Sequence, residues 1–294
     1  MSHPLFLALS LFFTPATPYG GNVAMAYAVA DSPVPVYDSV NFQEYIGSKR
    51  FLSKDNLFLG HLFTAFAGTV FHIEEKRAGS WGDLYRVTTR EYPCGNACWV
   101  DGRLLTLRHK RPQERSRKMP DARTIVARLE KMERDGLRYC WGCNFPSGLP
   151  NNLALYARDG VTAHRNIWLM AGGDCSGILY FATDGSTPRN TAEMLTYGKG
   201  VPVRSLSAAH IAQRLKPLDL VVWRGHVLIV MEKGEVIEAI NLYKKKRVQR
   251  IIRHSLETRL WEIMRRMKPV NSYFSDPLPV GKKFVVRRWH PGSK

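Results

Sequence analysis

Cys175 and His226 are the two residues whose types and surroundings indicate covalent chemistry. A thiol attacks a carbonyl group only as the thiolate, and a free cysteine with a pKa of about 8.5 is mostly protonated at neutral pH. Cys175 lies in the sequence Gly-Asp-Cys-Ser-Gly, which opens an apolar stretch of helical character. The dipole at a helix start and a neighbouring histidinium both favour a thiolate there. A lone cysteine is usually a small buried apolar residue, but His226 begins an apolar strand and can supply the base.

A histidine base needs a third group on its other ring nitrogen, which fixes the tautomer and the orientation of the ring. If the hairpin loop that follows His226 is centred on Glu232, Glu238 becomes its direct cross-strand neighbour on the same face. A two-residue turn at Lys233-Gly234 would place Asn241 opposite His226 instead. We predict Glu238 as the third member, with Asn241 as the alternative.

The other four cysteines form two closely spaced pairs, Cys94 with Cys98 and Cys140 with Cys143. In an oxidising compartment such pairs form disulfides. Two alternatives remain: the four thiolates could bind zinc, or Cys140 and Cys143 could stay reduced and pack as apolar residues. We favour disulfides and expect no metal and no other cofactor.

The first thirty residues contain no Lys, Arg, Asp or Glu. Leu5–Phe13 is an apolar core of the length typical of an export signal, and Ala26-Tyr27-Ala28 and Ala28-Val29-Ala30 offer cleavage sites before Asp31. The alternative, a buried N-terminal helix, would be broken by prolines and glycines at 15–21. We therefore predict a signal peptide over residues 1–30 and an exported protein, periplasmic or extracellular.

The charge is strongly positive, with 43 Lys plus Arg against 25 Asp plus Glu and a formal net charge of +18. This excess favours contact with polyanions or carboxylate-rich material. No run after residue 30 approaches the roughly 20 apolar residues of a spanning helix, which excludes a multi-pass membrane protein and a transmembrane anchor in the mature chain. The basic runs at 108–118, 244–250 and 282–288 are spread and follow no readout motif, so no nucleic-acid partner is expected.

Hydrophobic patterning divides the rest of the chain in two. Residues 31–107 contain short alternating segments at 34–37, 68–73, 81–87 and 98–100, which favour a small all-β barrel. Residues 108–120 are strongly basic and cannot bury enough apolar surface to order themselves, so we predict a linker or a solvated edge there. Residues 121–294 predict an α+β domain whose elements are a helix capped by Asp121 and ended by Gly136, a helix at Cys175, a helix capped by Thr187 with Pro188 first, and a three-strand meander over 218–239.

Five motifs of the second domain occur in a recognisable order: Tyr139-Cys-Trp-Gly, Asp174-Cys-Ser-Gly-Ile, Pro188-Arg-Asn-Thr, Asp219-Leu-Val-Val-Trp and His226-Val-Leu-Ile-Val. Over residues 121–245 the chain resembles the NlpC family of papain-like cysteine peptidases, which are bacterial peptidoglycan hydrolases. Residues 31–107 resemble the bacterial Src-homology-3-like domains that precede the catalytic domain in many relatives. The resemblance implies helices packed on an antiparallel sheet after a small barrel.

The resemblance also implies an activity: cleavage of the γ-D-glutamyl–diamino acid bond in cell-wall stem peptides or muropeptides. The positive charge of the chain adds anionic wall polymer as a further expected partner. Cys175 matches the nucleophile, His226 the general base and Glu238 the polar third member. Tyr139 matches a tyrosine beside the nucleophile, and Asp174 and Ser176 match residues that line the substrate cleft. Two features depart from the family pattern: Cys143 replaces a glycine, and residues 144–173 form a longer connection that is expected to shape the cleft.

Two other classes of function fit the same sequence. An amidase or an amide-forming acyltransferase could use the same thiol and histidine, because the acceptor that reaches the acyl group decides the product. A nonhydrolytic wall-binding protein with a decayed site is the second, but the retained Cys175, His226 and Glu238 argue against it.

Overall fold

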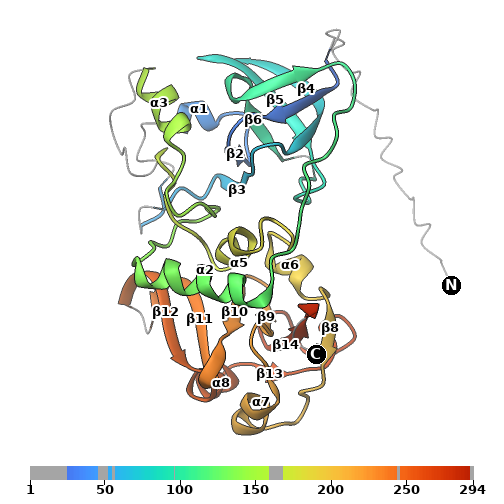
Figure 1. Cartoon of the computed structure of the whole chain (residues 1–294), viewed down its shortest axis with the longest axis vertical. Helices are drawn as coiled ribbons and strands as arrows, with labels where there is room; N and C mark the ends of the chain where they lie inside the picture. Colours follow the sequence, from blue (N-terminus) through green and yellow to red (C-terminus); the bar gives the residue numbers. More distant parts are fainter. Residues whose placement is uncertain are drawn as a thin grey trace, which may run out of the picture.

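The structure, a computed structural model, describes residues 25–45, 52–54, 57–95, 97–158, 168–243 and 246–291. The apolar segment Leu5–Phe13, which carries the predicted export signal, lies outside these residues. The described chain forms a mixed α/β fold with two sheets (Figure 1), as expected for the α+β class. Within it, none of the helices has both the length and the apolar character needed to cross a membrane.

The N-terminal sheet contains seven strands in the order β3-β2-β6-β5-β4-β1-β7, with antiparallel pairing. Two short helices, α1 (Phe42–Tyr45) and η2 (Gly102–Leu104), lie in its connections. The strands are β1 (Tyr27–Ala30), β2 (Val34–Tyr37), β3 (His61–Ala65), β4 (Val70–Gly79), β5 (Gly82–Thr88), β6 (Trp99–Asp101) and β7 (Leu105–Arg108).

The four strands predicted from alternation correspond to β2, β4, β5 and β6, whereas β1, β3 and β7 were not foreseen. Closure of the sheet into a barrel remains a prediction. The strand β1 lies between β4 and β7, and its four residues are the last four of the predicted signal segment 1–30. A cut before Asp31 would therefore remove a paired internal strand, so the expected cleavage point conflicts with the fold.

The C-terminal sheet runs in the order β12-β11-β10-β9-β14-β13, with β8 also on β14; its pairs are antiparallel except β13–β14. Its strands are β8 (Lys199–Val201), β9 (Leu220–Trp223), β10 (His226–Val230), β11 (Glu235–Tyr243), β12 (Lys246–Ser255), β13 (Lys268–Pro269) and β14 (Lys283–Arg288). The helical elements are α2 (Ala122–Arg134), α3 (Pro150–Arg158), α5 (Gly177–Ala182), α6 (Thr191–Met194), α7 (Ala208–Arg214), η3 (Glu232–Gly234) and α8 (Leu256–Met264).

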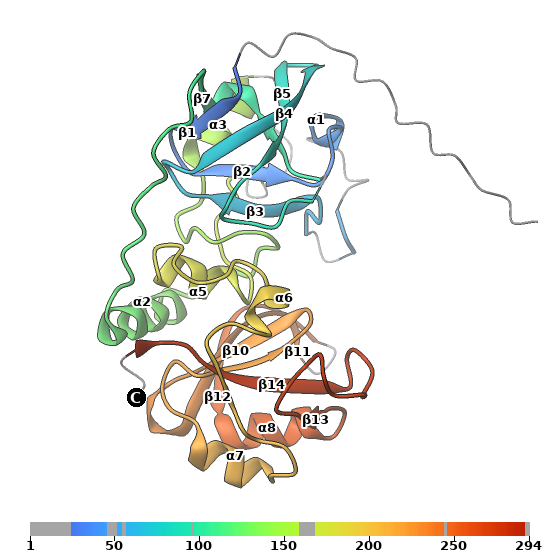
Figure 2. The same cartoon turned by 90° about the vertical axis from the view of Figure 1, so that its right-hand side faces the viewer.

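Helices cover both faces of this sheet (Figures 1 and 2). Alternate strand residues such as Val227 and Ile237 pack with α2 and α5 on one face, in the cluster that contains Cys175. The intervening residues, such as Leu228 and Val236, pack with α7 and α8 on the other. The period-two alternation of the strands thus buries both faces, which explains why the runs 220–223 and 227–231 are apolar at every position.

Helix starts were predicted with mixed success. Asp121 caps α2 through its side chain, which accepts the Thr124 N–H over 2.7 Å, as expected. The helix predicted at Thr187 is wrong: α6 begins at Thr191 and is capped by Asn190, whose side chain accepts the Glu193 N–H over 3.0 Å. The Thr187 hydroxyl instead bonds the Thr183 hydroxyl over 2.9 Å, and residues 187–190 form a link in which Thr187 and Arg189 are buried.

Described residues of the long connection 144–173 pack on the N-terminal sheet. Its residues Leu153, Tyr156 and Trp168 belong to the same core cluster as the strands of that sheet. The Tyr156 hydroxyl lies 3.1 Å from the Tyr37 hydroxyl of β2, and both side chains are buried. The Asp174 N–H donates to the Cys143 carbonyl over 3.1 Å, so this connection leaves and rejoins the second part of the molecule at one place and ties the two parts together.

Candidate active site

Cys175 lies in the turn that leads into α5, and only 8% of its surface is exposed. The turn begins at Asp174, whose carbonyl accepts the Ile178 N–H over 3.2 Å. The Asp174 carboxylate accepts the N–H groups of Ser176 at 3.1 Å and Gly177 at 2.7 Å. Because these donors are the ones that a helix start leaves unpaired, Asp174 fixes the turn that carries the thiol.

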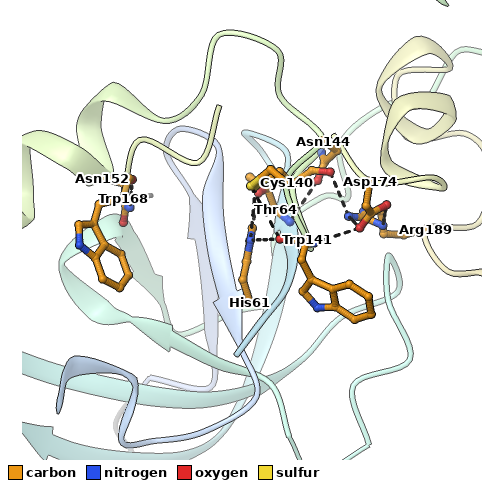
Figure 3. Close-up of a disulfide and its surroundings, with 11 residues drawn as sticks. His61, Thr64, Cys140, Trp141, Asn144, Asn152, Trp168, Asp174 and Arg189 are labelled. Atoms are coloured by element: carbon orange, nitrogen blue, oxygen red, sulfur yellow. Dashed lines mark hydrogen bonds and ion pairs between the residues drawn. A yellow bond between two sulfur atoms is a disulfide. The ribbon is translucent and has the colours of Figure 1, made fainter. Parts of the chain in front are cut away.

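The Asp174 carboxylate also joins segments that are distant in the sequence (Figure 3). Arg189 donates Nη1 to Oδ1 over 3.0 Å and Nη2 to Oδ2 over 2.8 Å, a two-point contact. The Gly142 N–H donates to Oδ2 over 3.0 Å, and Arg189 Nη1 also bonds the Ser176 hydroxyl over 2.9 Å. Asp174 and Ser176 are thus buried and held by Arg189; their predicted role in substrate binding remains a prediction.

Tyr139 lies beside the thiol. It pairs with Gly173 through an isolated parallel bridge, and its side chain packs in the apolar cluster that contains Cys175. Burial raises the pKa of Tyr139 well above its ordinary value, and the nearby Asp174 and Cys175 raise it further. The phenol therefore stays protonated and is available as a hydrogen-bond donor next to Cys175.

His226 is the first residue of β10, at the rim of the sheet, and its ring lies 5.1 Å from that of Trp223. Its Nε2 lies 2.6 Å from Glu238 Oε2, and Cys175 lies close enough to the ring to interact with it. Burial by itself lowers the pKa of His226, but the bonds and charges of Cys175 and Glu238 outweigh burial and raise it to about 10. The imidazole is therefore held between the thiol and a carboxylate, in its charged form.

Glu238 reaches His226 by a register that differs from the predicted one. The β10–β11 ladder pairs Ile229 with Ile237 and Val230 with Val236, so its centre is Lys233, which has a φ of 57°. Continued along the strands, this register sets Ile240 opposite His226, and Glu238 is a diagonal neighbour on the same face. The direct pairing is therefore wrong, as is the pairing with Asn241, although the contact between His226 and Glu238 is present.

The Glu238 carboxylate is completely buried and faces one arginine and two histidines. Arg259 of α8 donates Nε to Oε1 over 2.6 Å and Nη2 to Oε2 over 3.1 Å. His254 Nε2 of β12 lies 3.4 Å from Oε1. Burial alone would raise the pKa of Glu238, but His226 and Arg259 lower it to about 2, so the group is a carboxylate at neutral pH.

A histidine of the N-terminal sheet contacts the 141–143 loop, which in turn bonds Asp174. His61 of β3 lies 3.3 Å from the Trp141 carbonyl and 3.8 Å from Cys143 Sγ (Figure 3). Burial and the charge of Arg189 lower the pKa of His61 to about 4, so the ring is neutral. Gly142 has a φ of 73°, and a Cβ there would come within 2.5 Å of the His61 carbonyl, so a side chain cannot be accommodated.

The cysteines are arranged as the favoured interpretation expects. Cys94 pairs with Cys98 and Cys140 with Cys143, which leaves Cys175 as the free thiol. The zinc alternative and the reduced packing of Cys140 and Cys143 are therefore wrong for this structure. Among the described residues, no group of three or more His, Cys, Asp and Glu side chains is arranged to hold a metal ion.

Comparisons with known proteins identify structural neighbours only. No protein family matches the sequence, and no curated protein matches it. An NlpC/P60 family protein from Bacillus cereus is similar in structure, with 15% identity and a TM-score of 0.34, over 91% of this chain and 64% of that one. The peptidoglycan hydrolase RipB from Mycobacterium tuberculosis aligns with 19% identity and a TM-score of 0.31, over 57% and 65% of the two chains.

A third neighbour is the P60 domain of an antigen from M. avium subspecies paratuberculosis, with 17% identity and a TM-score of 0.30, over 56% of this chain and 96% of that one. The chain spans about two thirds of the first two neighbours. Identities and TM-scores this low establish no family, so the function rests on the geometry around Cys175.

Proposed function

We propose that the protein is an exported cysteine peptidase that cleaves the γ-D-glutamyl–diamino acid bond of cell-wall stem peptides. The observation that carries this proposal is the chain of contacts from Cys175 to His226 to Glu238, with 2.6 Å between His226 Nε2 and Glu238 Oε2. A thiol, a histidine and a buried orienting carboxylate in this order are the parts of a nucleophilic acyl-transfer site.

The reaction follows from these groups. The Cys175 thiolate attacks the γ-glutamyl carbonyl carbon, and the backbone N–H of Cys175 stabilises the oxyanion. The tetrahedral intermediate collapses as the protonated His226 gives its proton to the leaving amine of the diamino acid, and a thioester remains on Cys175. Water then attacks the thioester, His226 takes its proton, and the glutamate carboxylate leaves as the thiolate reforms.

The choice of substrate is supported by the charge and the cysteines of the chain. A net charge of +18 favours a carboxylate-rich substrate, and stem peptides carry free carboxylates on glutamate and on the diamino acid. Two disulfides favour an oxidising compartment, where the cell wall lies. The motif order around Tyr139, Asp174, Cys175 and His226 points to the same bond through its resemblance to the NlpC peptidases.

Mass spectrometry of the products formed from defined muropeptides tests this proposal. The wild-type protein is expected to release a fragment that ends in D-glutamate, and Cys175→Ala is expected to release none while it keeps its fold by circular dichroism. His226→Ala is the second test variant and should also release no product. His210→Ala changes an exposed histidine on α7, so it is the matched control for His226→Ala and should retain activity. Cleavage at a sugar–peptide amide, or transfer to an added amine without hydrolysis, would assign the site to an amidase or an acyltransferase instead.

A further inference from the structure

Arg259 connects α8 to the centre of the candidate site. Its guanidinium makes a two-point contact with Glu238, at 2.6 Å from Nε to Oε1 and 3.1 Å from Nη2 to Oε2. The remaining nitrogen, Nη1, donates to Glu262 Oε2 over 3.1 Å, one turn further along the helix. The guanidinium is therefore held at both ends, and its side chain is only 16% exposed.

We propose that Arg259 is a positioning residue of the site, which holds the Glu238 carboxylate with Oε2 turned toward His226 and keeps that carboxylate ionised. This inference rests on the proposed Cys175–His226–Glu238 site and extends it by one residue. A carboxylate with one partner can rotate and can take up a proton when it is buried, whereas a two-point contact with Arg fixes its plane.

The ionisable groups around Glu238 come from three elements. His226 belongs to β10, His254 to β12, and Arg259 with its partner Glu262 to α8. Cys175 interacts with His226 and is linked to Glu238 through it. Removing the positive charge of Arg259 makes the local potential more negative, which raises the pKa of both Glu238 and His226. The proton-linked steps of the site should therefore shift together to higher pH.

The docking of α8 itself rests mainly on other contacts. Leu256, Leu260 and Ile263 are buried in the core cluster with strand residues such as Val236, and Ser255 caps the helix by accepting the Thr258 N–H. The apolar stripe of α8 thus supplies the packing of the helix. Three polar contacts of Arg259 reach Glu238 and Glu262, which is an arrangement expected if this residue acts on the site.

The test compares the pH dependence of the protein with that of two variants. Arg259→Gln removes the charge and the two-point contact, while Arg259→Lys keeps the charge and loses the contact. The first readout is the rate at which iodoacetamide alkylates Cys175, the fifth cysteine, which lies outside both disulfides. This rate reports the thiolate and needs no peptide substrate. The second readout is the pH profile of kcat/KM on a defined muropeptide.

Arg253→Gln is the matched control, because Arg253 is also an arginine with several ion pairs but contacts Glu133 and Glu235. For Arg259→Gln we expect the acid and alkaline limbs of the kcat/KM profile, and the pH dependence of alkylation, to move up by about one pH unit. The kcat/KM at pH 7 should fall about 10-fold to 100-fold. Arg259→Lys should keep the limbs near their wild-type pH and lose part of kcat. Arg253→Gln should lower the melting temperature without moving either limb.

A double variant shows whether Arg259 acts through Glu238. If it does, Arg259→Gln combined with Glu238→Gln loses little more than Glu238→Gln alone. Additive losses, or unchanged limbs in a folded Arg259→Gln protein, would overturn the inference. If Arg259→Gln does not fold, unchanged kcat in Arg259→Lys overturns it. A shifted alkylation profile in a protein that cleaves no stem peptide would retain the role of Arg259 and reject the proposed function.

Discussion

His226 lies between Cys175 and Glu238. Because both neighbours affect its pKa, they determine the pH range in which the Cys175 thiolate and the His226 imidazolium exist together. Glu238→Gln keeps a hydrogen-bond acceptor but removes the negative charge that supports the imidazolium. The pKa of His226 then falls, so the alkaline limb of kcat/KM should move to lower pH by about one unit. Activity at pH 7 should fall by about 100-fold. A pH series of initial rates on a stem peptide measures both effects.

Asn241→Ala provides the comparison for this prediction, because Asn241 was the alternative partner of His226 in the sequence. The alkaline limb of kcat/KM and the rate at pH 7 of the Asn241→Ala variant should match those of the wild-type protein. A normal profile for Glu238→Gln together with a large loss for Asn241→Ala would show that Glu238 does not orient His226.

Single residues of the site were predictable to different degrees. Cys175 and His226 are recognisable because each stands in a local motif, and Glu238 because it lies close by along the same hairpin. Arg259 was missed because it reaches Glu238 from α8, and no local pattern records which helix face covers a strand. Arg189 occurred in a motif, but its contact with Asp174 depends on the non-helical link 187–190 that precedes α6.

At the scale of elements, β1 makes a prediction about processing. Tyr27–Ala30 pairs with β4 on one side and β7 on the other, so its loss would expose the edges of both strands. If an export signal is removed, the cut is expected before Tyr27, and Ala24-Met25-Ala26 offers small residues at the required spacing. N-terminal sequencing of the exported protein locates the cut.

A chain that starts at Tyr27 should fold, and a chain that starts at Asp31 should be less stable or insoluble. Equal stability of the two chains in urea would show that β1 is dispensable, and a mature N-terminus at Asp31 would restore the cleavage point first expected from the sequence.

Elements were predictable where the signals are local. Asp121 and Gly136 mark the ends of α2, and the apolar runs mark β9 and β10. The register of β10 on β11 was not predictable. Lys233 has a left-handed backbone conformation and lies at the centre of the loop, and a shift of one residue in that centre changes which side chains face each other. Thr187 failed as a cap because its hydroxyl bonds Thr183 instead.

At the scale of the whole molecule, Arg115 joins its two parts. Its guanidinium bonds the buried Glu91 near the N-terminal sheet, at 2.6 Å, and the Asp184 carbonyl after α5, at 3.0 Å. Glu91 also accepts the Tyr180 hydroxyl over 2.5 Å. The segment 108–120, expected to be a linker, therefore contributes Arg115 to an ion pair with the buried Glu91. Arg115→Ala leaves Glu91 without its cation and should lower the free energy of unfolding by about 3 kcal/mol.

Chemical denaturation measures this loss, and Arg111→Ala is the control because Arg111 pairs with Glu114 at the surface. An exposed pair of this kind contributes less than about 1 kcal/mol. Similar losses in the two variants would show that Arg115 does not hold the parts together.

The central claim is that Cys175 forms a covalent acyl-enzyme with the γ-glutamyl group of a stem peptide. Acid quenching during turnover of a defined muropeptide, followed by mass spectrometry of the protein and of its fragments, tests it directly. We expect a mass increase equal to the acyl fragment on the fragment that contains Cys175, and no increase in Cys175→Ala. Continued release of the D-glutamate-terminated product by Cys175→Ala, with no adduct on the wild-type protein, would contradict the claim.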